Sequence, residues 1–245
     1  MGKYFDVSYM IQSFPGLLAA VHITLAVTLI SAFFGICLGV LLAVIRANHV
    51  RGLTQAVAVY VSFIRGTPFL VQLFLVYFGV PEILAHVGID TRNVPPLLFV
   101  LLVFILHVAA YGSEIMRSSI EAVAEGQKEA AASLGMTGWQ AYRRVILPQA
   151  FSMAVPPLIN TVISVVKGTS LIFNVGIVDI MRKADLMGGN SQRYLELFID
   201  VALIYGVLIF LISQVGQMLE KRNSLQGYIG PAITGKGSGS YGYNH

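Results

Sequence analysis

Five long apolar stretches decide what this chain can fold into. Each holds about 20 residues or more, the length that an α-helix needs to cross a hydrocarbon core about 30 Å thick. Lipid offers the backbone no hydrogen-bond partners, so a helix is the expected form of each stretch. Charged residues make up only 11% of the chain, against roughly 25% in a soluble domain. An all-α integral membrane protein is therefore predicted, with spans near residues 14–45, 55–84, 94–112, 154–178 and 195–219.

An odd number of spans places the two ends of the chain on opposite faces of the membrane. Lys and Arg near span ends gather on the cytoplasmic side, and their distribution predicts an outer N-terminus, an inner C-terminus and a cytoplasmic loop over 114–149. The formal net charge of +4 then reflects orientation, and nucleic-acid binding is not expected. The inner set is Arg46, Arg51, Arg117, Lys128, Arg143, Arg144, Lys221 and Arg222, and the outer set is Lys3, Arg92, Arg182, Lys183 and Arg193.

The cytoplasmic loop carries a fixed pattern of residues. Glu129 opens a Glu-Ala-Ala run, Gly135 follows six residues later, and Leu147-Pro148 comes after a basic, helix-forming segment. This spacing resembles the EAA loop of ATP-binding-cassette (ABC) importer permeases, whose short coupling helix sits in a groove of the ATPase subunit; Val145 replaces the usual Ile. Gly135 is expected to permit a tight turn or a close backbone approach. The resemblance assigns ATPase coupling to Glu125, Gly126, Glu129, Ala130, Ala131, Leu134, Gly135, Leu147 and Pro148.

The resemblance also implies an assembly. It predicts a type I ABC importer permease fold in a bacterial cell membrane, with a second permease subunit, identical or related, a cytoplasmic ATPase dimer and an external solute-binding protein. The chain itself is then not an enzyme and holds no cofactor, because the partner ATPase binds ATP and Mg²⁺. Residues 1–225 are expected to form the transmembrane domain, and 226–245, rich in Gly, Ser and Tyr, a flexible tail.

Two features of the first and second stretches concern helix geometry. Gly35 and Gly39 are four residues apart, which lets two helices approach closely in lipid; packing within one subunit is the expected use and dimerisation the alternative. In the second stretch, Thr67-Pro68 predicts a helix start or a sharp kink. Arg65 is expected near the cytoplasmic interface or paired with a carboxylate or carbonyls. The Arg-Gly-Thr-Pro element resembles the polar-amino-acid branch of these permeases.

The third stretch ends in a segment that resembles the "AAY-x-x-E-x-x-R" pattern of the same branch. Glu114 and Arg117 lie three residues apart and share a helix face, so an ion pair is expected. An anchor at the membrane interface is one role for the pair, and gating is the other. His107 stands where members of the branch often carry Asn, and no function is assigned to it.

The fourth stretch predicts contacts with the transported molecule. Lys167 is ionisable amid apolar residues, which makes a functional role the default hypothesis; the alternative is that it binds backbone carbonyls at a broken helix. The "Lys-x-Thr-Ser-Leu" segment of the branch is similar. Asn160, Ser164, Lys167 and Leu171 follow one helical stripe. The predicted substrate path comprises Asn160, Ser164, Lys167, Gly168, Thr169 and Ser170.

Two details bear on the identity of the solute. Branch members often carry an acid or an amide at the position of Gly168, and its absence argues against strict selection of cationic amino acids; an Asp there is expected to restore that preference. Residues 170–185 resemble the cystine-type members, and Asp179 is expected to pair with Arg182 or Lys183. A polar amino acid is the predicted solute, with cystine among the candidates.

One rival from another class stays open at this point. An ion-driven secondary transporter or channel for amino acids would use Lys167 and Glu114 as a relay. Phosphate-loop chemistry is not expected, because the Walker-like string over 230–236 has Gly237 where Ser or Thr belongs. The motifs favour a permease that works by alternating access, driven by the ATPase through the loop.

Overall fold

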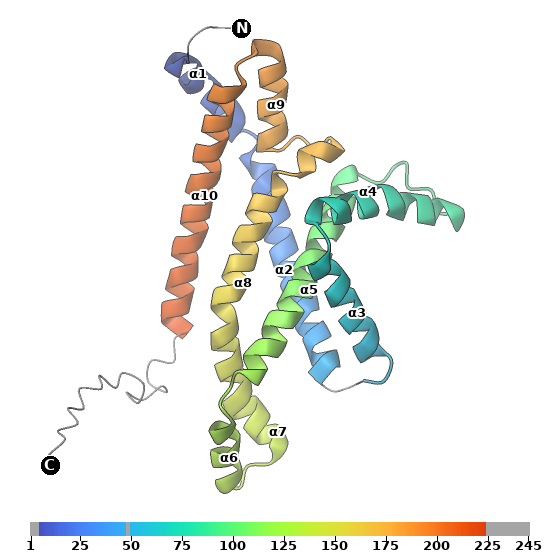
Figure 1. The fold of residues 1–245 in the computed structure, drawn as a ribbon, viewed down its shortest axis with the longest axis vertical. Helices are drawn as coiled ribbons and strands as arrows, with labels where there is room; N and C mark the ends of the chain where they lie inside the picture. The colour runs from blue at the N-terminus through green and yellow to red at the C-terminus, as the bar shows by residue number, and fades with distance from the viewer. Residues whose placement is uncertain (1–4, 48–49, 224–245) are drawn as a thin grey trace, which may run out of the picture.

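A computed structural model describes residues 5–47 and 50–223, and every regular element within them is helical. The predicted tail over 226–245 lies outside the described residues. Figure 1 shows a bundle of long helices with short helices at both ends. In chain order the elements are α1 (Val7–Leu18), α2 (Val21–Ala47), α3 (Leu53–Gly66), α4 (Phe69–His86), α5 (Pro96–Glu121), α6 (Glu125–Ser133), α7 (Gly138–Ala141), the π-helical turn η1 (Tyr142–Ile146), α8 (Leu147–Thr169), the 3₁₀ turn η2 (Ile172–Val175), α9 (Ile180–Ser191) and α10 (Tyr194–Asn223).

The centre of the bundle is the close pair of α2 and α5. A Cβ added at Gly35 would lie 2.5 Å from the Cβ of Val108, and one added at Gly39 would lie 3.0 Å from the carbonyl oxygen of Ala109. Only glycine permits so close a contact of the two backbones. The predicted packing of this pair within one subunit is confirmed. The core around it contains Val27, Leu73, Val100, Val103, Phe104, Val108, Val165, Ile172 and Val175.

Five helical segments of the described residues are long and apolar enough to cross a membrane, as predicted, but their bounds differ from the predicted ones. The first span begins at Val21, because residues 14–18 belong to α1. The third runs on to Glu121, past the predicted end at residue 112, and the fourth starts at Leu147 instead of residue 154. The residues added to α5 are mostly polar, and those added to α8 mix Gln149 and Ser152 with apolar side chains, so apolar content alone does not reveal them. Pro156 lies inside α8.

The second apolar stretch forms two helices. Thr67 has φ −117° and ψ 148°, and α4 begins directly after Pro68. A residue that precedes proline is pushed out of the helical region, and this ends α3. The predicted helix start is confirmed. Figure 1 shows that α4 turns away from α3 and runs sideways from the bundle, so residues 55–84 do not form one straight span.

A π-helical turn, η1, joins α7 to α8. The N–H of Leu147 donates to the carbonyl of Tyr142, five residues earlier. Pro148 has no N–H, and its ring would clash with a carbonyl in a regular helical turn. The wider π turn accommodates it and rotates the side chains that follow. The helix from Gly138 to Thr169 is thereby continuous and links the cytoplasmic loop directly to a membrane span.

The two ends of the bundle carry different elements. Figure 1 shows α6, α7 and the end of α10 at one end, and α1 and α9 at the other. The cytoplasmic loop predicted over 114–149 thus ends in short helices on the same side as the C-terminal end of α10, and α1 lies at the opposite end of the bundle.

Candidate functional site

The predicted coupling loop is a hairpin of two short helices, α6 and α7. Helix α6 ends at Ser133, and two residues later Gly135 has a φ of +72°, in the left-handed region. The N–H of Gly135 donates to the carbonyl of Ala132 (2.9 Å), and the N–H of Met136 donates to that of Ala131 (3.1 Å). These two bonds close a Schellman turn, for which glycine is the preferred residue. Gly135 makes the tight turn that the sequence predicts.

The tip of this hairpin exposes apolar side chains. Leu134 is 77% exposed and Trp139 is 68% exposed. Thr137 and Gln140 cap the start of α7 through a reciprocal capping box, so Trp139 stands on an ordered turn. Large apolar groups exposed together on a polar hairpin indicate a protein contact surface. Sequence reasoning missed Trp139, although the only Trp of the chain in a polar loop was a usable signal.

A cavity of about 220 Å³ lies where the hairpin meets the start of α8. Gln149 bonds Gln127 (3.3 Å) across it and holds α6 against α8. Other predicted coupling residues lie outside: the Glu125 carboxylate accepts from Lys128 (2.7 Å), whereas the Glu129 carboxylate is exposed. The cavity is lined by Gln127, Ala130, Ala131, Leu134, Met136, Arg144, Val145, Pro148 and Gln149, which include four predicted coupling residues.

Above the hairpin, three guanidinium groups share one carboxylate. Glu114 pairs with Arg117 (2.6 Å), Arg46 (2.8 Å) and Arg65 (3.5 Å). The expected ion pair of Glu114 with Arg117 is confirmed, as is the pairing of Arg65 with a carboxylate. Arg46 was not anticipated as a partner. The cluster ties α2, α3 and α5 together at a single carboxylate.

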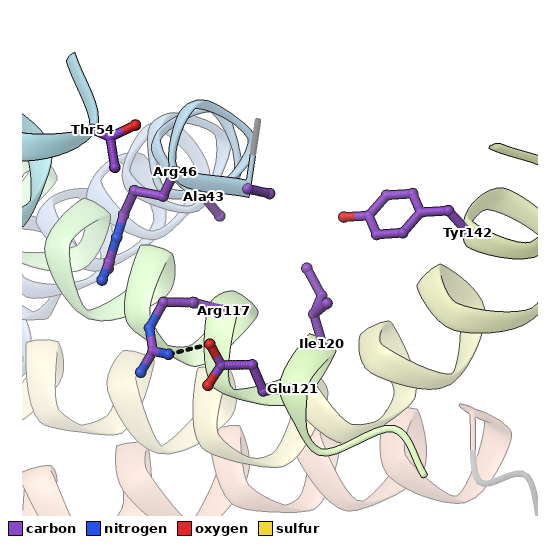
Figure 2. Close-up of a pocket in the computed structure, with 8 residues that line it drawn as sticks. Ala43, Arg46, Thr54, Arg117, Ile120, Glu121 and Tyr142 are labelled. Carbon is purple, nitrogen blue, oxygen red and sulfur yellow. Dashed lines mark hydrogen bonds and ion pairs between the residues drawn. The ribbon is translucent and has the colours of Figure 1, made fainter. Parts of the chain in front are cut away.

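Figure 2 shows a cavity of about 370 Å³ beside this cluster. The Arg117–Glu121 ion pair forms one wall, and Tyr142 of η1 points toward the other side chains from across the cavity. The arginine cluster therefore lies next to the turn that follows the coupling hairpin. The lining residues are Ala43, Arg46, Ala47, Thr54, Arg117, Ile120, Glu121 and Tyr142.

A third cavity, of about 320 Å³, lies between α5 and α8. It brings together Asn160 and Ser164, two predicted residues of the substrate path, with His107 and Tyr111, which the sequence left without a role. Lys167 is exposed three residues beyond Ser164 on the same stripe of α8. The lining residues are His107, Tyr111, Ile115, Pro157, Asn160, Thr161 and Ser164, and none of them is acidic.

Like Lys167, the predicted path residues Gly168, Thr169 and Ser170 do not line that cavity. A Cβ at Gly168 would lie 3.2 Å from the ring of Phe104. Thr169 is fully buried and donates to the carbonyl of Val166 (2.7 Å). The hydroxyl of Ser170 donates to the carbonyl of Lys167 (2.7 Å). These three residues have packing and helix-end contacts.

The expected pairing of Asp179 with a neighbouring cation is wrong. The Asp179 carboxylate caps α9 by accepting from the backbone N–H of Arg182 (2.9 Å), and burial raises the pKa of this carboxyl. The Arg182 guanidinium instead pairs with Asp185 (2.8 Å). Asp179 directly precedes α9, where an Asp side chain can cap the first N–H groups of the helix. Its carboxylate makes this capping bond in place of an ion pair.

An Asp at position 168 was expected from the sequence to favour cationic amino acids, but the contacts of Gly168 predict a different result. A Gly168→Asp side chain would meet Phe104 and Phe69, so it would overpack the core and bury a carboxylate. We expect the variant to lose stability, by about 2 kcal/mol or more, and not to gain cationic substrates. Thermal unfolding of the purified subunit measures this, with Gly79→Ala as a control because a Cβ at Gly79 meets nothing within 4 Å. An unchanged melting temperature together with arginine uptake would contradict it.

Comparison with known proteins gives one consistent result. The model of a family described as "binding-protein-dependent transport system inner membrane component" matches residues 35–225. The L-cystine transport system permease protein TcyL of Bacillus subtilis is 37% identical over 91% of this chain and 93% of its own length. The probable amino-acid ABC transporter permease protein PatM of Vibrio harveyi is 42% identical over 86% and 93%. A crystal structure of an amino acid ABC transporter with histidines superposes with a TM-score of 0.80 at 32% identity, over 89% of this chain and 99% of that one.

Proposed function

The chain belongs to the family of binding-protein-dependent transport system inner membrane components, and from that premise we propose that it carries a polar, zwitterionic amino acid of the cystine type. It is the permease subunit of an ATP-driven ABC importer of amino acids and has the type I fold. This assignment rejects the ion-driven secondary transporter or channel. The two residues of that relay also have other surroundings. Glu114 of α5 pairs with arginines from α2, α3 and α5, and Lys167 is exposed on α8.

The lining of the cavity between α5 and α8 supports a zwitterionic solute. None of the lining residues carries a carboxylate that would select a cationic side chain. Asn160 and Ser164 offer polar groups, and exposed Lys167 offers a positive charge further along the same stripe. The cystine permease of Bacillus subtilis, 37% identical, makes cystine the first solute to test. ATP-driven uptake of cystine by the reconstituted importer, with glutamine and arginine as competitors, tests the solute; stronger competition by arginine than by unlabelled cystine would contradict it.

The partners follow from the family. Separate ATPase subunits bind ATP and Mg²⁺ and hydrolyse the nucleotide, a second permease subunit completes the pathway, and an external binding protein delivers the solute. The observation that supports the ATPase contact is the exposed Leu134 and Trp139 at the tip of the ordered hairpin. Buried aromatic anchors dominate the binding energy of such interfaces.

Replacing the apolar tip is expected to separate the two subunits. Trp139→Ala removes the largest side chain of the contact, and a loss of about 2 kcal/mol or more lowers the affinity for the ATPase by about 30-fold. Co-purification of the ATPase with tagged permease measures this effect. Ile89→Ala is the matched control, because Ile89 is an exposed apolar residue (52%) outside the hairpin. Equal recovery of the ATPase with both variants would refute the docking surface.

The orientation is part of the same proposal, with the N-terminus outside and the hairpin in the cytoplasm. Cysteines introduced singly at Ser8 and Ser133, in a Cys37→Ala background, report it. An impermeant thiol reagent is expected to label position 8 in intact cells and position 133 only after permeabilisation. The reverse pattern would invert the topology.

A further inference from the structure

His107 is held in place by a chain of hydrogen bonds that starts at the break between α3 and α4. The side-chain amide nitrogen of Gln72 donates to the carbonyl oxygens of Ile64 (2.6 Å) and Thr67 (2.9 Å). Carbonyl groups at the C-terminal end of a helix, here α3, lack partners within the helix. Gln72 is only 3% exposed. Its amide oxygen then faces Nδ1 of His107 at 3.1 Å. The helix break at Thr67-Pro68 thus fixes the orientation of an amide, and the amide orients the imidazole.

The direction of these bonds determines which imidazole nitrogen carries the proton. Carbonyl oxygens only accept, so the Gln72 atom that faces them must be its nitrogen, and the atom that faces His107 must be its oxygen. An oxygen opposite Nδ1 requires Nδ1 to donate. The neutral ring then has an unprotonated Nε2, which is a hydrogen-bond acceptor. Phe69 and Tyr111 pack against the ring at centroid distances of 4.9 and 4.7 Å and hold it in this position.

Two hydroxyl groups that line the same cavity also present acceptors to it. The hydroxyl of Thr161 donates to the carbonyl of Pro157 (2.9 Å), and that of Ser164 donates to the carbonyl of Asn160 (2.9 Å). Both hydroxyl protons are therefore used on the backbone, and the oxygens keep lone pairs for the cavity. Only the Asn160 amide and the Tyr111 hydroxyl retain donors among the side chains of the lining. The lining is rich in acceptors and contains no carboxylate.

We infer that His107 is a specificity-determining residue of the substrate path, which accepts a hydrogen bond through Nε2 from the ammonium group of the transported amino acid. This inference rests on the proposed function and adds to it the orientation of the solute. An ammonium brings three donors, which match the acceptors of His107, Thr161 and Ser164. Its carboxylate then points along the α8 stripe toward Lys167, which is exposed three residues beyond Ser164. The amino end lies at α5, and the acid end lies toward the end of α8.

The tautomer of His107 is the first test, and it is read from the wild-type protein. ¹⁵N NMR of the importer complex with labelled histidine distinguishes Nδ1–H from Nε2–H, and a difference spectrum against His107→Asn assigns the signal. We expect Nδ1 protonated, Nε2 bare, and a shift of the Nε2 signal when cystine is added. An Nε2-protonated ring, or an Nε2 signal that saturating cystine leaves in place, overturns the inference.

The second test measures the contribution to transport. His107→Leu keeps the bulk but removes the acceptor, and the loss of a hydrogen bond to a charged group should raise the cystine concentration for half-maximal uptake by about 10-fold or more. His107→Asn, which retains an oxygen acceptor, should recover most of that loss. His86→Leu is the matched control, since this histidine is exposed and bonds only the carbonyl of Glu82 in its own helix and the Glu82 carboxylate. Equal half-saturation in the leucine variant and wild type overturns the inference, whereas a wild type without ATP-driven cystine uptake overturns the proposed solute.

Discussion

Gly135→Val is expected to abolish ATP-driven uptake while the subunit still inserts into the membrane. The φ of +72° at this position is costly for a β-branched residue, by about 1 to 3 kcal/mol. The strain would open the Schellman turn and move Leu134 and Trp139 relative to each other. A Cβ would meet no neighbouring atom within 4 Å, so the loss would come from backbone conformation alone.

The measurement for this variant is uptake into proteoliposomes, alongside the yield of membrane-inserted protein. Gly135→Asn should keep more activity than the valine variant, because asparagine tolerates the left-handed region. Gly138→Ala is the control, since Gly138 lies in the same hairpin with open space around it and no positive φ. Normal uptake by the valine variant would mean that the turn has no part in coupling.

Glu114→Gln is expected to have the second large effect, a loss of both stability and transport. The amide leaves the guanidinium groups of Arg46, Arg65 and Arg117 without their shared countercharge, although Arg117 keeps Glu121. The Glu114 side chain is 20% exposed, so solvent replaces little of what is lost. Arg46 is 18% exposed, but Arg117 and Arg65 are 34% and 45% exposed. The expected cost of about 1 to 3 kcal/mol therefore lies between that of a surface ion pair and that of a buried one. The three arginines would repel one another, and the ion pairs that link α2, α3 and α5 through Glu114 would be lost.

Thermal unfolding of the purified complex, together with uptake, measures this effect. Asp185→Asn is the matched control, because it breaks a single ion pair, that of Asp185 with Arg182. The side chain of Arg182 is 35% exposed and that of Asp185 is 39% exposed. Such a pair contributes about 1 kcal/mol at most. A melting temperature of the Glu114 variant equal to that of the Asp185 variant would show that the three-arginine cluster is not a structural tie.

Features that depend on local chemistry were predictable. The break before α4 follows from Pro68, which restricts Thr67 whatever surrounds it. The left-handed turn at Gly135 follows from a glycine at the end of a helix. The ion pair of Glu114 with Arg117 follows from helical spacing. The end of α5 and the start of α8 were not predictable from apolar content, because polar residues such as Glu114 and Gln149 interrupt the apolar pattern while the chain remains helical.

Contacts between helices were the part that sequence reasoning missed. Arg46 and Glu114 are 68 residues apart, and Gln72 and His107 are 35 apart, so no spacing rule connects them. Gly168 faces Phe104, although its place in the Lys-x-Thr-Ser-Leu segment had assigned it to the substrate path. Adjacent helical positions differ by about 100° in direction, and neighbours in sequence therefore face different surroundings.

The sequence by itself determined the membrane class, the helical spans, the coupling hairpin and the family, because apolar length, proline, glycine and motif spacing act within a few residues of each other. The tertiary structure alone decided which faces of α5 and α8 enclose a cavity, which arginines share Glu114, and which nitrogen of His107 contacts Gln72. Those outcomes depend on how the helices are rotated against one another, and that rotation is set by close packing across the whole bundle.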